Sequence, residues 1–411
     1  MRKHPTPNLN DDRTRMVELP RATSAKLAVA GIVVLIIAGW LSEPLNRFDD
    51  SLTRFSASYL VSYVFYLSIS LGALFFVALQ HLVRAGWSVT VRRLAEILAA
   101  NVLWCGVLFL PILVPVLLGN SPLYAWSHPA VVAADELLQH KSLYLNGPFF
   151  AVRAVFYFLV WGLMAWFFFR QSTRQDDSGD PTLTRRMEKA APAAMILFGV
   201  TITFASFDWL MSIEPLWFST IFGLYFFSGA VVGALAALIL FALALQMGGM
   251  ATRAITVEHY HDLGKLLLGF IVFWGYMAFS QYLLIWYANI PEESVWYLAR
   301  QTGPWTWITV GLLFGHLLIP FLGLLSREVK RRKILLGAWA VWILAAHWLD
   351  IYWLVMPTFA PERLPFGLMD LCCVAGVGSL FLAGVIRTAR SCELIPLGDP
   401  RLKESLAFEN V

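Results

Sequence analysis

Four ionisable side chains stand inside otherwise apolar stretches of this sequence: Arg153, Asp208, His347 and Asp350. An ionisable group in hydrocarbon costs roughly 2.5–3.5 kcal/mol on insertion scales, so each one needs a partner or a use. If each stretch is a helix rising about 1.5 Å per residue, Arg153, Asp208 and Asp350 lie one to two turns below the same membrane surface. His347 lies one turn from Asp350 on the same helix face. These four residues form a predicted outer cluster, which is either a structural Arg–Asp pairing or one end of a proton path.

Two further sets of polar residues lie deeper along the same predicted helices. Near the opposite, cytoplasmic surface are His81, Glu96, Asp262 and Lys265; helix ends are hydrated, and we expect Asp262 just before a helix, where a carboxylate complements the helix dipole. The uncharged polar residues and one histidine between the two surfaces are Asn101, Tyr276, Ser280, Gln281 and His316. This middle set either carries water between two half-channels or forms interhelix hydrogen bonds.

His316 and His347 are candidates for haem ligation, because they are predicted at similar depth on consecutive antiparallel helices. They are the one pair that suits bis-His ligation, but lone membrane histidines are more often polar or protonatable core residues, so haem is not expected. The four cysteines show no CxxC spacing, which excludes an iron–sulfur cluster and a cysteine zinc site. No P-loop, zinc motif or catalytic triad is visible, so we expect no metal and no redox centre in this chain.

Composition defines the class of protein that must position these residues. The 411 residues are 58% hydrophobic and 14% charged, against roughly 45–50% and about 25% in soluble domains. A formal net charge of +4 is too small and too sparse for a nucleic-acid-binding face. The 17 Trp, 30 Phe and 13 Tyr suit the aromatic belts at membrane surfaces. The sequence therefore predicts an all-α polytopic membrane protein.

A spanning helix needs about 20 mostly apolar residues, and ten segments meet that requirement. They are 26–45, 59–82, 95–118, 149–169, 191–212, 218–247, 263–287, 305–325, 334–356 and 368–386. A polar run of more than twenty residues precedes the first apolar segment, and no small-residue cleavage site follows that segment. The segment is therefore predicted to remain as a helix rather than to be part of a signal peptide.

Orientation follows from the distribution of basic residues. With a cytoplasmic N-terminus, 25 of the 31 Lys and Arg residues fall on cytoplasmic segments, which is a strong positive-inside bias. Both termini are then cytoplasmic. The residues 1–25 and 387–411 are polar tails that we expect to dock onto neighbouring proteins, and the polar stretch 170–188 is expected to be a mobile loop. The external segment 119–147 is long enough for a short surface helix.

A weak internal repeat suggests how the ten helices are grouped. Ser68–Leu74 resembles Phe227–Leu235, and the helix that ends near Asp208 resembles the one that contains His347 and Asp350. Because the paired segments are four helices apart, the repeats share one orientation. We predict a transmembrane domain over 26–386 with two parallel four-helix bundles, 57–213 and 216–357, and with the first and tenth helices flanking them.

Two long blocks carry a family resemblance. Residues 207–225 (FDWLMSIEPLWFSTIFGLY), together with 261–267 (HDLGKLL) and 279–293 (FSQYLLIWYANIPEE), resemble the ActF membrane subunits of bacterial alternative complex III. The wider group of NrfD or polysulfide-reductase-like membrane subunits is more distant. The resemblance extends from the first to the tenth helix.

The resemblance implies a function that composition does not show. Alternative complex III is a quinol:cytochrome c or quinol:electron-acceptor oxidoreductase that oxidises menaquinol or ubiquinol. Its electrons pass through iron–sulfur clusters of ActB and c-haem subunits, and ActC is the NrfD-like sister of ActF. The implied chain is a multi-pass subunit of the bacterial inner membrane with no redox centre of its own. The implied proton path uses Asp208, His347 and Asp350 on the external side, Gln281 and His316 in the middle, and Glu96, Asp262 and Lys265 at the cytoplasmic mouth.

Three other roles remain open at this point. The chain is a structural scaffold of the same complex, a second quinone-binding subunit, or an independent secondary transporter, which the parallel repeat would suit. A scaffold would need Arg153 and Asp208 for assembly only, whereas a transporter would be stable without redox partners.

Overall fold

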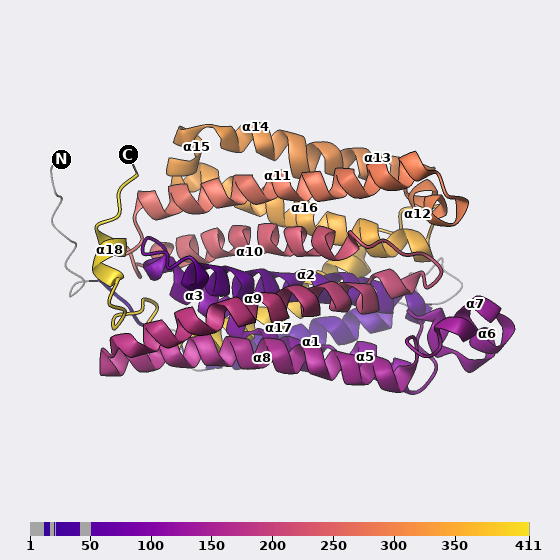
Figure 1. The fold of residues 1–411 in the computed structure, drawn as a ribbon, viewed down its shortest axis with the longest axis horizontal. Helices are drawn as coiled ribbons and strands as arrows, with labels where there is room; N and C mark the ends of the chain where they lie inside the picture. Colours follow the sequence, from indigo (N-terminus) through magenta and orange to yellow (C-terminus); the bar gives the residue numbers. More distant parts are fainter. Residues whose placement is uncertain (1–11, 17–19, 21, 42–50, 411) are drawn as a thin grey trace.

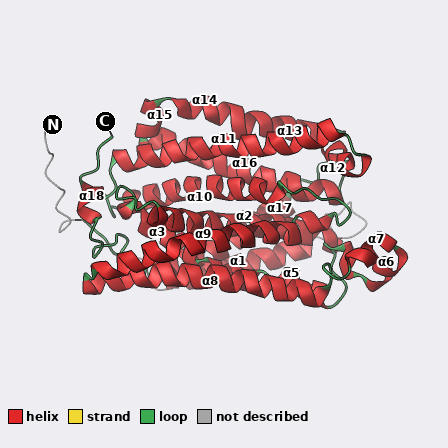
Figure 2. Ribbon diagram, in the orientation of Figure 1, coloured by secondary structure: helices red, strands yellow, loops and turns green. Residues whose placement is uncertain are grey.

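The computed structural model describes residues 12–16, 20, 22–41 and 51–410, and throughout these ranges the regular structure is helical (Figures 1 and 2). Ten helices or helix runs in this described part are long and apolar enough to cross a membrane. The predicted all-α polytopic class is therefore confirmed. The spanning helices lie side by side, with short helices at both ends (Figure 1).

Along the chain, the described spanning helices fall into two consecutive groups of four with two flanking helices, while their division into two separate bundles stays a prediction. The first group is α2 (Ser51–Leu82), the run α3 (Val89–Ala100), α4 (Val102–Leu108) and α5 (Leu110–Leu117), α8 (Gly147–Ser178) and α9 (Pro181–Trp209). The second group is α10 (Phe222–Met247), α11 (Val257–Ala288), the run α13 (Trp305–Leu312), η4 (Leu313–Leu318) and α14 (Ile319–Leu325), and α16 (Lys333–Phe359). The flanking helices α1 (Ala22–Leu41) and α17 (Leu368–Ala389) pack on each other.

Short helices mark the two ends of the molecule. The end with residues 12–16, α15 (Arg327–Arg331), α18 (Leu402–Leu406) and the C-terminal segment is called the tail side. The end with η2 (Ala125–Ser127), α6 (Pro129–Ala134), α7 (Glu136–Lys141), η3 (Met211–Ile213) and α12 (Pro291–Gln301) is called the loop side. The expected surface helix in 119–147 is thus present, and α12 is an addition that the sequence did not indicate.

Helix α2 is the centre of the packing. In the most apolar 18-residue stretch of α2, 94% of the residues are buried. The helix contacts α3, α9, α10, α16 and α17. The approach to α10 depends on Gly72, because a Cβ atom there would come within 2.6 Å of the Ala234 methyl group and closer still to the Ala230 carbonyl oxygen. Small residues allow two membrane helices to approach in this way. Gly72 belongs to one repeated segment, and Ala230 and Ala234 belong to the other, so the repeat brings small residues to the contact between the two groups.

The prediction of a mobile loop over residues 170–188 is wrong. Helix α8 continues to Ser178 and α9 begins at Pro181, so only Gly179 and Asp180 connect them. Gly179 ends α8 with a φ of 62°, and the Asp180 carboxylate accepts the Thr182 backbone N–H at 2.8 Å as an N-cap. The two helices continue beyond the apolar stretch because their caps, rather than hydropathy, determine where they end.

Other boundaries also differ from the prediction. The third span is broken near Asn101 and again near Phe109. The second break lies two residues before Pro111, which has no backbone N–H to donate to the preceding turn. Asp262 lies inside α11 rather than before it. The first helix begins at Ala22, and the predicted residues 42–45 fall outside the described part of the chain.

The described parts of both tails pack on this chain's own tail side. The Asp12 carboxylate accepts three backbone N–H groups of residues 252–254 at 2.8–3.0 Å, and the Leu394 N–H donates to the Thr14 carbonyl at 2.7 Å. Ser405 donates to the Trp87 carbonyl at 2.6 Å and lies 3.1 Å from His259 Nε2 of α11. The C-terminal segment therefore connects the first helix group with the second. Docking onto neighbouring proteins stays a prediction.

The Gly72 contact gives a direct test of the packing. We expect Gly72→Ala to lower the melting temperature of the detergent-purified protein, because the added methyl group forces α2 and α10 apart. Gly199→Ala in α9 is the matched control, since nothing lies within 4 Å of its Cβ position and alanine favours a helix interior by about 1 kcal/mol. Equal melting temperatures for the two variants would contradict this account.

Candidate functional site

The Arg153 and Asp208 side chains form a closed ion pair on the loop side. Arg153 of α8 donates from Nε to Asp208 Oδ2 at 2.8 Å and from Nη2 to Oδ1 at 3.0 Å. The Tyr157 hydroxyl donates to the same carboxylate at 2.7 Å, and Arg153 also donates to the Tyr144 carbonyl at 2.8 Å. The guanidinium lies 3.8 Å from the centre of the Tyr144 ring. Both charges are therefore compensated, and Arg153 points at Asp208 rather than at lipid headgroups.

Asp350 has a different environment. It lies on α16 with 2% of its surface exposed. Its carboxylate accepts hydrogen bonds from the Tyr225 hydroxyl of α10 and from Trp274 Nε1 of α11, the latter at 3.1 Å. No Lys, Arg or His within the described residues lies at ion-pair distance from it. An ionised carboxylate here would be neutralised only by hydrogen-bond dipoles, so Asp350 is a position where a proton can bind.

His347 lies one turn away and faces the contact between the two helix groups. Its Nε2 atom is 2.9 Å from the Ser68 hydroxyl of α2. Its ring occupies space that is open because residues 229 and 233 of α10 are glycines: Cβ atoms there would lie 3.1 Å and 2.7 Å from ring carbons. His347 therefore connects α16 of the second group with α2 of the first.

His316 lies beside this residue in an unusual segment. Residues Leu313–Leu318 form a π-helical turn, a feature that often occurs at functional sites. The His316 ring centre is 3.9 Å from that of Trp274 and 6.2 Å from that of His347. Both His316 nitrogens are buried and lack a partner among the described residues. A buried polar group without a partner calls for an explanation, such as a water molecule or a migrating proton.

These contacts define a central group in the second bundle and its junction with α2. Its members are Ser68, Tyr225, Trp274, His316, His347 and Asp350. His316 and His347 are also the pair considered for haem. Since His347 Nε2 is bonded to Ser68, it would have to leave that partner to ligate an iron atom.

The predicted outer cluster is thus divided between two places. Arg153 and Asp208 pair between α8 and α9, whereas His347 and Asp350 belong to the central group. Within the described part of the chain, no hydrogen bond or ion pair joins the two. The shared depth was expected to bring them together, but they lie in different helix groups with separate partners.

The predicted cytoplasmic mouth is a buried ionic network on the tail side. Glu96 lies 3.0 Å from Arg93 and 3.5 Å from Arg92. Arg93 also pairs with Asp176 at 2.8 Å, and Arg92 pairs with Asp399 of the C-terminal segment. This end of the molecule is therefore held closed by compensated charges.

The other predicted tail-side residues surround this network. The His81 ring stacks on Phe168 with 5.4 Å between centres, and His81 Nε2 has no partner in the described chain. Asp262 pairs with Lys265, whose ammonium group also donates to Asn410 Oδ1 at 3.0 Å. Lys265 is half-exposed, so this pair lies at the surface of the tail side.

The predicted middle residues are scattered. Gln281 is buried, and its Oε1 has no partner within the described ranges, while Ser280 is half-buried. Tyr276 is 62% exposed on the outer face of α11 and does not line the interior of this chain. Asn101 donates to the Phe381 carbonyl at 3.1 Å and connects the third span with α17. Of this set, His316 alone belongs to the central group.

Sequence reasoning missed the partners that define each environment. Ser68 began one of the repeated segments and Tyr225 ended the block 207–225, but neither these two residues nor Trp274 was assigned a polar role. Their uncharged side chains are common in membrane helices, so no signal marked them. The tail-side partners Arg92, Arg93, Asp176 and Asp399 were read only as surface charge.

Arg300 in α12 covers the loop side of the second group. It is fully buried, donates to the Leu354 carbonyl at 2.8 Å, and lies 3.5 Å from both Glu214 and the centre of the Trp296 ring. Burial lowers its pKa to about 10 despite the opposing effect of Glu214. The guanidinium is still charged at neutral pH and holds α12 against α16.

The fold and the site together define a polytopic helical membrane protein. Among its described residues, Asp208 is held in an ion pair with Arg153, whereas Asp350 is buried with two hydrogen-bond donors and no cationic partner. Comparison with protein-family models finds no match to this chain, and comparison with curated proteins finds no match either.

The two buried aspartates are expected to respond differently to neutralisation. Asp208→Asn leaves the Arg153 charge without a counter-ion, so we expect a loss of about 3–5 kcal/mol in stability. Asp350→Asn removes no ionic partner and is expected to cost about 1 kcal/mol through one altered hydrogen bond. Melting temperatures in detergent measure both, with Glu136→Gln in the exposed α7 as control. A larger loss for Asp350→Asn would contradict the assignment.

Proposed function

We propose that this chain is an ActF-type membrane subunit of a bacterial alternative complex III and supports proton translocation coupled to quinol oxidation. The observation that supports it most is Asp350, a buried carboxyl group with two hydrogen-bond donors and no cationic partner among the described residues. A proton can bind to and leave such a group, whereas Asp208 is held in an ion pair with Arg153. The chain would itself be a non-redox subunit of a proton-translocating oxidoreductase.

The central group supplies chemically suitable neighbours for proton movement. His347 lies one turn from Asp350, and His316 lies 6.2 Å from His347 between ring centres. Imidazole nitrogens accept and donate protons near neutral pH more readily than other side chains. Ser68 continues this series onto α2, which also carries Gln80 and His81, two buried residues with an unpartnered atom each in the described chain. We propose that protons pass between Asp350 and the tail side along α2.

Orientation and partners follow from the sequence. The positive-inside bias makes the tail side cytoplasmic, so both tails are proposed to lie in the cytoplasm of a bacterial cell and the spans in its inner membrane. The proposed partners are ActC, the iron–sulfur subunit ActB and the c-haem subunits. The block 207–225 supports the assignment, because it runs from the end of α9 to the start of α10 and contains both Asp208 and Tyr225.

The test is the ratio of protons moved to electrons transferred. In vesicles that contain the whole complex, Asp350→Asn and His347→Gln are expected to lower this ratio while quinol oxidation continues. Glu136→Gln is the control on the loop side. An unchanged ratio in both variants, in complexes that assemble normally, would refute proton conduction and favour a scaffold. A stable protein that copurifies with no iron–sulfur or c-haem subunit would favour an independent transporter.

A cavity favours quinone binding as a second candidate function. It has a volume of about 430 Å³ and lies between α10, α11, α12, the α13–η4 run and α16. Its lining is largely aromatic and apolar, with polar atoms from Tyr225, Trp274, Gln301 and Thr309. These residues fit a quinone head group, which needs a flat apolar space and a few donors. The rings of Tyr225 and Trp274 would contact it, while their single O–H and N–H protons are donated to Asp350.

A bound quinol would supply two electrons, which the iron–sulfur subunit of the proposed complex would accept, and two protons. The residues of this chain would contact it through the rings of Tyr225 and Trp274, and Asp350, which accepts a hydrogen bond from each, would hold a proton beside them. This role depends on the same carboxyl group as proton conduction, so the two proposals are compatible.

Filling the cavity tests this second role. Ala278→Phe places a ring inside the cavity and is expected to reduce, several-fold, the menaquinone or ubiquinone that copurifies with the complex, as measured by mass spectrometry of the extracted lipids. Val272→Phe is the matched control, because Val272 lies on the outer face of α11 and is 44% exposed. Equal quinone content in the two variants would contradict binding at this position.

A further inference from the structure

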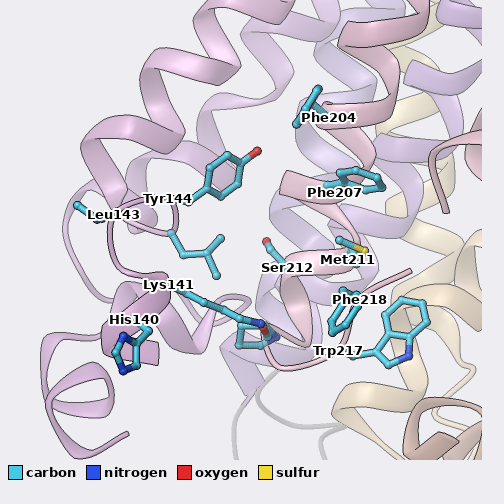
Figure 3. Close-up of a pocket in the computed structure, with 12 residues that line it drawn as sticks. His140, Lys141, Leu143, Tyr144, Phe204, Phe207, Met211, Ser212, Trp217 and Phe218 are labelled. Carbon is cyan, nitrogen blue, oxygen red and sulfur yellow. The ribbon is translucent and has the colours of Figure 1, made fainter. Parts of the chain in front are cut away.

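A second cavity lies on the loop side, away from the central group (Figure 3). Its volume is about 290 Å³. One wall comes from α7 and the residues after it, and the other from the end of α9, η3 and the segment that leads to α10. Figure 3 shows Lys141 reaching across the opening and the aromatic side chains of the second wall facing it. We call this cavity the loop-side groove; its walls include Lys141, Tyr144, Phe204, Phe207, Met211 and Phe218.

The groove combines a cation with an apolar wall. Lys141 has no carboxylate partner among the described residues, and its ammonium group donates one hydrogen bond, to the Pro215 carbonyl at 2.6 Å. Two further N–H donors remain on this group. Partial burial lowers the Lys141 pKa, which means that the charged form lacks full hydration in this position. An anion beside Lys141 would restore the missing stabilisation.

The carboxylates of Asp208 and Glu214 near the groove interact with other partners. The Asp208 carboxylate is bonded to Arg153 and Tyr157, and the Glu214 carboxylate faces Arg300 at 3.5 Å. Arg153 stacks on Tyr144, which lines the groove, but its charge is already matched by Asp208. Among the described residues that line the groove, Lys141 therefore supplies a positive charge that no carboxylate matches.

The apolar wall extends into the membrane. Phe204 and Phe207 belong to the spanning part of α9. Phe204 is 44% exposed and Phe218 is 54% exposed, so both present ring surface to the exterior of this chain. A lipid acyl chain lying on these rings would cover their exposed apolar surface, and its headgroup would then lie on the loop side near Lys141.

We propose that the loop-side groove binds one anionic phospholipid, with its phosphate at Lys141 and an acyl chain along Phe204 and Phe218. A phospholipid combines the two chemistries that the groove offers, a negative headgroup at the membrane surface and a hydrocarbon chain below it. A soluble anion would use Lys141 but leave the aromatic wall unoccupied. This binding does not depend on the proposed redox role of the protein.

The lipid would have a structural consequence. Its headgroup would connect α7 with the segment after η3, which the Lys141–Pro215 hydrogen bond already joins. Both segments adjoin the Arg153–Asp208 pair, since Tyr144 contacts Arg153 and Ser212 donates to the Asp208 carbonyl. The bound lipid would thus shield this pair from water and stabilise the loop side.

Native mass spectrometry of the full-length protein in detergent tests the proposal, with added dioleoyl phosphatidylglycerol or dioleoyl phosphatidylcholine. The wild-type protein is expected to retain one phosphatidylglycerol in preference to phosphatidylcholine. Lys141→Gln should weaken phosphatidylglycerol binding about fivefold, the usual effect of one basic residue on an anionic headgroup. Lys141→Arg should retain binding, and Phe204→Ala should weaken the binding of both lipids.

The control is Lys403→Gln, an exposed lysine of α18 on the tail side, which should leave lipid binding unchanged. Phosphatidylglycerol binding by Lys141→Gln at the wild-type level would overturn the proposal, as would equal retention of the two lipids by the wild-type protein. Photo-crosslinking from position 218 provides an independent measurement in the assembled complex. Labelled phospholipid is the expected product, and a polypeptide crosslinked there in its place would also overturn the proposal.

Discussion

The close approach of α2 and α10 is the constraint on which the rest of the structure depends. Gly72 lies against the Ala230 carbonyl, so the two helices meet with almost no side chain between them. At the same level, Gly229 and Gly233 leave room for the His347 ring, which reaches Ser68 on α2. In lipid, where helix association depends on close packing more than on the hydrophobic effect, small residues determine which helices can meet. Neighbouring small residues of α10 therefore serve both purposes, since Ala230 and Ala234 face Gly72 and Gly229 and Gly233 face the central histidine.

Charge is distributed in this framework in two distinct ways. The loop-side pair and the tail-side network match each buried cation with at least one carboxylate, and these groups hold helices together. Asp350 is held by uncharged donors, so its protonation state can change without breaking an ion pair. A membrane protein that moves protons needs both kinds of site, compensated ones to keep its shape and an uncompensated one to bind the proton. The proposed function rests on this contrast between Asp208 and Asp350.

The position of a residue along the chain predicts its depth in the membrane but not the neighbours of its side chain. Constant helix rise per residue predicted a similar depth for His316 and His347, and their ring centres lie 6.2 Å apart. Depth carries no information about rotation around the helix axis or about which neighbour a face meets. Tyr276 therefore lies on the outer face of α11, and Arg153 and Asp208 pair away from Asp350. The ends of α8 and α9 were predicted wrongly because hydropathy does not report helix caps. Gly179 ends α8 in the left-handed conformation, and Asp180 caps the start of α9.

The sequence by itself determined the class of protein, the order and number of its spanning segments, and part of its set of buried ionisable residues, including Asp208, His347 and Asp350. These properties depend on hydropathy, length and composition, which are local along the chain. Only the tertiary structure decided which of those residues are compensated. Ser68, Tyr225 and Trp274 come from three different helices, and Asp399 reaches Arg92 from the C-terminal segment. Partnership between residues so far apart in sequence depends on helix packing, and packing is set by shape at contacts such as Gly72.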